Sequence, residues 1–71
     1  MEIVTIRVEF IYLGQALKLA GLVESGVMAK DVITDGLVKV NGEVDLRRGR
    51  KLYEGDIVDF DGQQFKIASK V

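Results

Sequence analysis

The stretch LGQALKLAGLVESGVMAKDVITDGLVKVNG, residues 13–42, decides the fold, because its apolar residues change from helical to strand spacing partway along. Two groups of apolar residues repeat at the spacing of one helix face. The first group is Leu13, Ala16, Leu17 and Ala20, and the second is Met28, Ala29, Val32 and Ile33. Gly21 and Gly36 follow the groups as helix stops, and Ser25 offers an N-cap. The pattern predicts two short helices that pack as a hairpin, because neither can bury its stripe alone.

Strand signals flank the predicted hairpin on both sides. Residues 3–8 alternate apolar and polar side chains, which predicts a strand. Residues 37–40 and 43–45 surround Asn41-Gly42, a favoured pair for a type I′ turn, and residues 57–60 and 64–67 surround Asp61-Gly62 in the same way. We therefore expect an α+β fold, a two-helix hairpin packed on a small, mostly antiparallel sheet, forming a single domain over residues 1–71.

The composition argues against catalysis and against a cofactor. The 71 residues include no histidine and no cysteine, which removes the commonest general base and all thiolate ligands. Asp56, Asp59 and Asp61 are a conceivable carboxylate cluster for a divalent cation, but they match no known loop spacing. We interpret them as acids that face solvent. The sequence predicts neither an enzyme nor a metal site.

No apolar stretch approaches the roughly 20 residues that span a bilayer. Residues 1–10 carry acids and alternate, unlike the basic and then apolar start of a signal peptide. We therefore expect a cytoplasmic protein with no membrane partner, and we expect a monomer.

The charge is unevenly distributed, although the net charge is only −1. Residues 14–51 carry seven basic and five acidic side chains, a net of +2, and the remainder carries three and six, a net of −3. Arg47, Arg48, Arg50 and Lys51 lie within five consecutive positions, here called the basic loop (residues 47–51). Like charges this close repel one another, and a phosphate partner would offset that repulsion. The loop predicts a polyanion-binding surface.

Other residues can extend that surface. Lys18 and Lys30 lie off the apolar stripes of their helices, and Lys39 alternates with two inward-facing valines. The start of the second helix offers backbone N–H groups to an anion. Each lysine could instead be an ordinary solvent-facing cation paired with Asp or Glu. Gly14 lies early in the first helix, where glycine is unfavourable, and we interpret it as a site of close packing rather than of contact with the polyanion.

Aromatic residues do not interleave with the basic ones, and only Tyr53 lies near the basic loop in sequence. This spacing argues against stacking of bases on a single-stranded platform. It favours recognition of the shape and backbone of a folded RNA.

Motifs in this order resemble the RNA-binding domain of the ribosomal protein S4 type. They are LGQALKLAG at 13–21, Ser25 with Ala29, Lys30 and Ile33, GLVKVNG at 36–42, and LYEGDIV at 52–58. The flanking segments look like the short stand-alone bacterial members, the YaaA/YbcJ-like group. The resemblance covers about residues 5–65. It implies an αL motif, two helices and a following β-turn segment that dock on structured RNA, such as ribosomal RNA or tRNA, with a ribosome-associated role.

The resemblance also implies which residues contact RNA. Carried over position by position, the RNA-binding residues are Gln15, Lys18, Ser25, Lys30, Lys39, Asn41, Arg47, Arg48, Arg50 and Lys51. The chain departs from the family at two positions. Tyr12 stands where a basic residue often precedes the first helix, and Gly26 stands where Arg often follows the N-cap serine. These departures shift weight to the basic loop.

Two other functions share parts of the pattern. A β-grasp sulfur carrier also has a Val-Asn-Gly-Glu hairpin followed by Glu-Gly-Asp, but it needs a C-terminal Gly-Gly, and this chain ends in ASKV after two preceding helices. A protein-interaction module could use the basic loop on an acidic partner. That second alternative has the same electrostatics and stays open.

Overall fold

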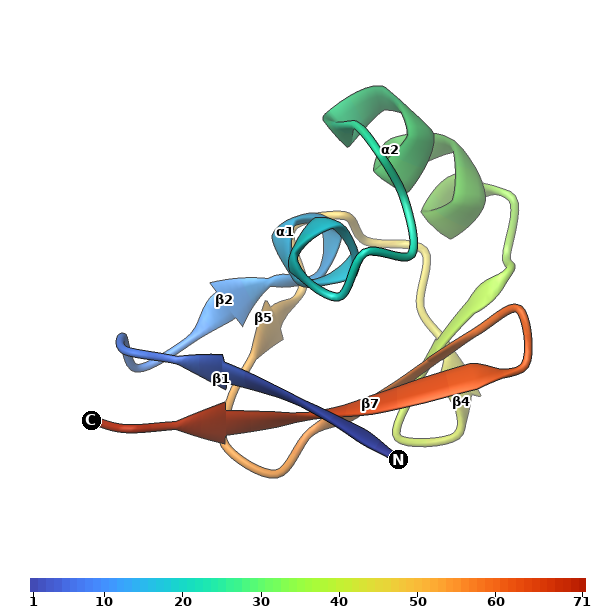
Figure 1. Ribbon diagram of the computed structural model, residues 1–71. Coiled ribbons are helices and arrows are strands. Elements are labelled where there is room, and N and C mark those ends of the chain that lie inside the picture. Colours follow the sequence, from blue (N-terminus) through green and yellow to red (C-terminus); the bar gives the residue numbers. More distant parts are fainter.

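The computed structural model describes residues 1–71, in which two helices cover one face of a five-stranded sheet (Figure 1). The sheet strands are β1 (Glu2–Ile6), β3 (Val38–Val40), β4 (Glu43–Val44), β6 (Ile57–Phe60) and β7 (Gln63–Ser69), in the spatial order β1-β7-β6-β3-β4. The β1–β7 pair is parallel and the other pairs are antiparallel. The helices are α1 (Leu13–Leu19) and α2 (Gly26–Thr34). The predicted α+β class, with a mostly antiparallel sheet, is confirmed.

A second, two-stranded sheet lies beside α1 and was not predicted. It pairs β2 (Ile11–Tyr12) with β5 (Lys51–Leu52), and we call it the β2–β5 ribbon. Tyr12 lies opposite Lys51 in this antiparallel register. Each strand has only two residues, too few for periodicity to reveal it. The ribbon fixes the end of the basic loop next to the start of α1 (Figure 1).

The helix signals in the sequence match the structure closely. The Ser25 Oγ accepts a hydrogen bond of 3.1 Å from the Met28 N–H, as an N-cap does. Gly21 and Gly36 adopt φ values of +75° and +78° just beyond the helices. One core assignment is wrong. Met28 is 44% exposed, because this short surface helix buries only the narrow stripe of Ala29 and Ile33.

Both predicted turns have the expected left-handed backbone. Asn41 and Gly42 have φ values of +52° and +87°, and Asp61 and Gly62 repeat this pattern at +54° and +75°. The first strand, however, ends at Ile6 rather than at residue 8. Its parallel register with β7 stops there, and Val8 beyond it is exposed.

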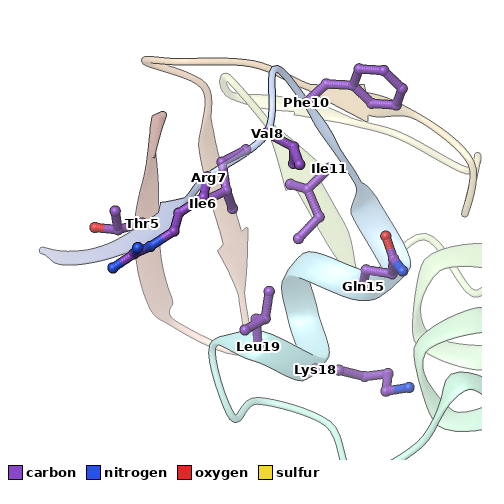
Figure 2. Close-up of a pocket in the computed structure, with 9 residues that line it drawn as sticks. All are labelled: Thr5, Ile6, Arg7, Val8, Phe10, Ile11, Gln15, Lys18 and Leu19. Atoms are coloured by element: carbon purple, nitrogen blue, oxygen red, sulfur yellow. The ribbon is translucent and has the colours of Figure 1, made fainter. Parts of the chain in front are cut away.

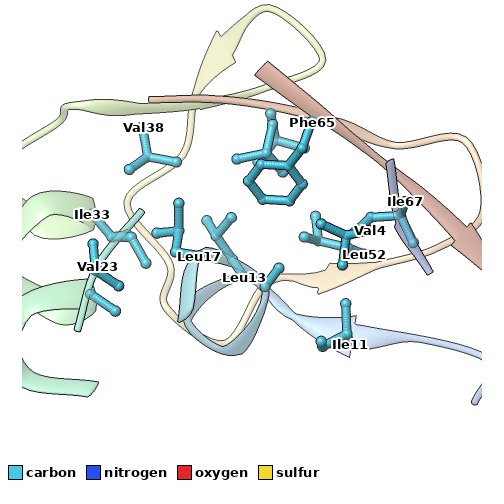
Figure 3. Packing of buried hydrophobic residues seen from close by; sticks show 14 of the residues in the cluster. Val4, Ile11, Leu13, Leu17, Val23, Ile33, Val38, Leu52, Phe65 and Ile67 are labelled. Atoms are coloured by element: carbon cyan, nitrogen blue, oxygen red, sulfur yellow. The ribbon is translucent and has the colours of Figure 1, made fainter. Parts of the chain in front are cut away.

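The core lies between the helical layer and the sheet (Figure 3). Fifteen apolar residues form one buried cluster, with Leu13 and Leu17 of α1 and Ile33 of α2 facing Phe65 and Ile67 of β7. All five are at most 1% exposed. This packing holds α1 against the sheet and thereby fixes the position of its outer flank. With seven and nine residues, α1 and α2 are both too short to span a bilayer.

Candidate nucleic-acid interface

The basic loop is organised around one buried carboxylate, Asp45. This residue is only 6% exposed. Its Oδ1 accepts hydrogen bonds of 3.0 Å from both the backbone N–H and the Nε of Arg47. Its Oδ2 accepts from the Arg47 Nη2 at 2.9 Å and from the Arg50 Nη1 at 2.7 Å. Two of the four cations are therefore already paired within the fold.

These contacts hold the pKa of Asp45 well below its usual range. The side-chain hydrogen bond from Arg47 is the largest cause, burial opposes it, and the bond from Arg50 adds to it. Sequence reasoning missed Asp45 and assigned it to a return strand. The one available signal was an acid placed directly before a run of cations. The repulsion within the basic loop is thus relieved in part by Asp45, so it does not by itself require a phosphate.

The four cations of the basic loop point to three different places. Arg47 and Arg50 turn to Asp45, while the Lys51 Nζ lies 4.8 Å from the centre of the Phe10 ring. Arg48 lies against the start of α1. A Cβ added to Gly14 would come within 2.8 Å of the Arg48 Cγ. The interpretation of Gly14 as a close-packing site is therefore confirmed.

The loop backbone also anchors the start of α1. The Leu13 N–H donates to the Arg50 carbonyl at 2.8 Å, and the Gly14 N–H donates to the Arg48 carbonyl at 3.1 Å. These two N–H groups have no partner inside the helix, so the loop satisfies them. The position of Arg48 relative to α1 is fixed at the backbone and not only through its side chain.

Replacement of Gly14 by alanine is expected to displace the Arg48 side chain while leaving the fold intact. The gain in helix propensity, about 1 kcal/mol, offsets much of the displaced contact. We expect a small change in melting temperature and an affinity for structured RNA weaker by up to about tenfold, as for one weakened charge-assisted contact. Thermal unfolding and RNA titration check the two effects separately. Unchanged affinity would show that the position of Arg48 does not matter.

A hollow of about 400 Å³ opens between the two helices and the basic loop, and we call it the interhelical hollow. Gln15 and Lys18 line it from α1, Gly26 from the start of α2, and Arg48 from the loop. Figure 2 shows the Gln15 and Lys18 side chains on the side of α1 that faces α2. Residues from three separate segments thus converge on one concave surface with two cations.

Lys18 also borders a second hollow, of about 600 Å³, on the other side of α1 (Figure 2). Its lining includes the apolar residues Ile6, Val8 and Leu19. Arg7, at the opposite rim, is the other cation there. The interhelical hollow holds three residues predicted to contact RNA, Gln15, Lys18 and Arg48, against two in this hollow. Neither of its cations is ion-paired, unlike Arg47 and Arg50, so it is the better candidate.

Several predicted contact residues lie outside the interhelical hollow. Lys39 lies between the buried Val38 and Val40, so it points to the sheet face away from the helices, opposite Asp59 of β6. Lys30 is exposed on α2 but does not line the hollow. The Ser25 hydroxyl is engaged as the N-cap of α2. The structure does not bring these three side chains together with Arg48.

Asn41 has a structural role in the hairpin. Its Oδ1 accepts from the Ile57 N–H at 2.9 Å, and its Nδ2 donates to the Asp56 Oδ1 at 3.0 Å. The other Asp56 oxygen accepts from the Tyr53 N–H at 2.8 Å. Asn41 and Asp56 therefore join the turn after β3 to the start of β6. A contact between Asn41 and RNA stays a prediction.

No group of three acidic, histidine or cysteine residues could hold a metal ion. The candidate site consists of the cations Lys18 and Arg48, the amide of Gln15 and the start of α2. An αL motif of two helices and a β-turn segment, with a cationic hollow along the helices, defines the class of fold. Residues 4–68 match the S4 domain, and the chain belongs to the S4 domain family.

Relatives and a solved structure agree with this assignment. The chain is 52% identical over 59 residues to the probable ribosome maturation protein RlbA of Bacillus subtilis, covering 83% of each chain. It is 42% identical over 53 residues to the putative RNA-binding protein YbcJ of Escherichia coli, covering 75% of this chain and 76% of that one. The sequence-based resemblance to S4-type domains and to the YbcJ-like group is confirmed.

The solution structure of YbcJ, described as revealing an αL motif involved in RNA binding, superimposes with a TM-score of 0.73. It is 35% identical, and the match covers 96% of this chain and 87% of that chain. The crystal structure of ribosomal protein S4e from Thermoplasma acidophilum matches with a TM-score of 0.60 at 20% identity, covering 82% of this chain and 30% of that one. The latter likeness concerns the fold alone.

Proposed function

We propose that this protein binds structured RNA through the interhelical hollow, without catalysis. The observation that carries the proposal is the convergence of Lys18, Arg48 and Gln15 beside the start of α2. Cations and the first N–H groups of a helix both favour phosphate oxygens. The S4 domain family and the RNA-related names of two relatives support RNA, rather than another polyanion, as the partner.

Ribosomal RNA is the favoured class of partner, with tRNA as the other. A relative with 52% identity is named for ribosome maturation, which supports a partner on the ribosome or its assembly intermediates. A shallow concave surface with few cations suits the shape and backbone of a folded RNA better than it suits a base sequence. As part of the same proposal, the protein acts in the cytoplasm as a monomer.

The salt dependence of binding tests the role of phosphate contacts. We expect the affinity for a ribosomal RNA fragment to fall steeply as salt rises, with a log–log slope of roughly −2 to −4, as for three to five phosphates. Fluorescence anisotropy with labelled RNA at several salt concentrations measures the slope. Binding that ignores salt would contradict the proposal.

The identity of the partner requires an experiment in cells. Crosslinking followed by sequencing of bound RNA is expected to recover ribosomal RNA or tRNA. The proposal would be overturned if no RNA were recovered and an acidic protein, once purified, bound the basic loop directly. That result would favour a protein-interaction module. Substitutions at Lys18 and Arg48 then locate the binding surface.

A further inference from the structure

An exposed aromatic cluster lies on the β2–β5 ribbon, next to the basic loop. The Phe10 ring centre is 5.5 Å from that of Tyr12 in an edge-to-face arrangement, and 5.8 Å from that of Tyr53. Tyr12 and Tyr53 are 44% and 43% exposed. The cluster consists of these three rings, two of which lie more than forty residues before the third in the printed sequence.

The pairing of β2 with β5 creates this cluster. Tyr12 lies opposite Lys51, and Tyr53 follows directly after β5. The observation that only Tyr53 lies near the basic residues holds in the sequence but is wrong in three dimensions. The linear spacing of the aromatic and basic residues therefore does not exclude base stacking on this surface.

The cluster is cationic at one edge. The Lys51 Nζ lies 4.8 Å from the centre of the Phe10 ring, a cation–π distance. Phe10 is half-buried, and Figure 2 shows its ring extending away from α1. Phe10 thus holds both tyrosine rings and Lys51 in place, and the two tyrosines keep open surface. This arrangement positions a cation beside exposed rings before any ligand arrives.

The cluster is also continuous with the interhelical hollow. Tyr12 lines that hollow together with Lys18 and Arg48. A folded RNA gripped there by its backbone would therefore have its next nucleotides beside Tyr12 and Tyr53. Scattered exposed apolar residues are ordinary on protein surfaces, but three aromatic rings in contact beside cations are the combination that stacks bases.

We infer that Tyr12 and Tyr53 form a stacking platform for an unpaired nucleotide of the bound RNA, with Lys51 beside its phosphate. The inference rests on the proposed function and makes it more specific. The preferred RNA has a bulged, looped or terminal unpaired base next to a helical stem. Stacking tolerates any base, so the platform selects for RNA structure rather than for sequence.

The test compares two short RNA hairpins that differ only in one unpaired nucleotide. The unpaired position carries a fluorescent adenine analogue whose emission is quenched by stacking. We expect the wild-type protein to bind the bulged hairpin more tightly and to quench its emission. Replacing both tyrosines by leucine is expected to weaken binding of the bulged hairpin by at least about fivefold more than it weakens binding of the fully paired hairpin.

The matched control replaces both tyrosines by phenylalanine, which keeps the rings and removes the hydroxyls. This phenylalanine variant is expected to retain both the preference for the bulged hairpin and the quenching of its emission. The leucine variant, by contrast, keeps apolar volume but has no aromatic ring. Both tyrosines are exposed by more than two-fifths, and thermal unfolding verifies that each double variant is folded. Equal affinity of wild type for the two hairpins, with unchanged emission, would overturn the platform. If wild type still bound both hairpins with a steep salt dependence, the proposed RNA-binding function would stand without the stacking platform.

Discussion

Replacing Lys18 and Arg48 together with alanine is expected to weaken binding of structured RNA by at least roughly a hundredfold, because hydrogen bonds to charged groups contribute about 1.5–3 kcal/mol each. These two cations line the interhelical hollow from α1 and from the basic loop. Neither has a carboxylate within ion-pair distance. The two ion pairs of the protein join Asp45 to Arg47 and to Arg50. Both charges are therefore available to phosphate oxygens. Titration of a labelled ribosomal RNA fragment at fixed salt measures the loss.

The salt slope gives an independent readout of the same double variant. Removal of two phosphate contacts is expected to make the log–log slope shallower by about two. A matched control replaces Lys66 and Lys70 by alanine, which removes the same net charge from the C-terminal strand and its end. Lys66 alternates with the buried Phe65 and Ile67, so it lies on the sheet face away from the helices. Equal losses of RNA affinity in the two double variants would contradict a localised interface.

Replacing Asp45 by alanine is expected to lower the free energy of unfolding by about 2 kcal/mol, since it removes a nearly buried acceptor of four hydrogen bonds. For a chain of this length, that loss corresponds to a fall in melting temperature of roughly 10 °C. The released guanidiniums of Arg47 and Arg50 then repel each other and Arg48. Denaturant unfolding and thermal scans measure the effect.

The control for this variant is Glu43→Ala, which removes one exposed acid from the adjacent β4 strand. It makes the same change in net charge, and we expect its stability to stay within about 0.5 kcal/mol of wild type. If Glu43→Ala destabilised the protein as much as Asp45→Ala does, net charge rather than the Asp45 contacts would explain the loss.

The pH dependence of stability provides a second test of Asp45. Its pKa is lowered in the folded state, so its carboxylate contributes stability above its unfolded pKa, about 3.9, and loses it as the pH falls through the folded value. The gap in unfolding free energy between wild type and Asp45→Asn is expected to be constant from pH 7 to about pH 5. It should narrow below about pH 4. A gap that persists unchanged in acid would contradict the role of the ionised carboxylate.

These variants replace the simplest test that the sequence suggests, alanine at Arg47, Arg48 and Arg50. That triple variant would leave the nearly buried Asp45 carboxylate without its guanidinium partners, which destabilises the fold. Weak RNA binding would then report a damaged loop rather than lost phosphate contacts. Arg48 and Lys18 avoid this difficulty because neither bonds to Asp45.

Local patterns were sufficient for most of the fold. The helix stripes, the Ser25 cap and the Asn41-Gly42 and Asp61-Gly62 turns depend on neighbours within a few residues. The predictions failed where contacts between residues distant in the sequence determine the structure. Val8 leaves the first strand because the pairing of β1 with β7 ends at Ile6. The β2–β5 ribbon was missed because strands of two residues have no readable period.

The sequence by itself determined the α+β class, the helical hairpin and a concentration of cations in residues 47–51. Those features follow from the spacing of residues along the chain, and that spacing is the same whatever fold the chain adopts. Only the tertiary structure decided what each cation does. Backbone hydrogen bonds between the basic loop and the start of α1 bring Arg48 to the hollow that Lys18 also lines. The nearly buried Asp45 pairs with Arg47 and Arg50, and strand pairing places Lys51 beside the aromatic rings. The gathering of side chains into a site depends on contacts between distant segments, which composition and periodicity do not encode.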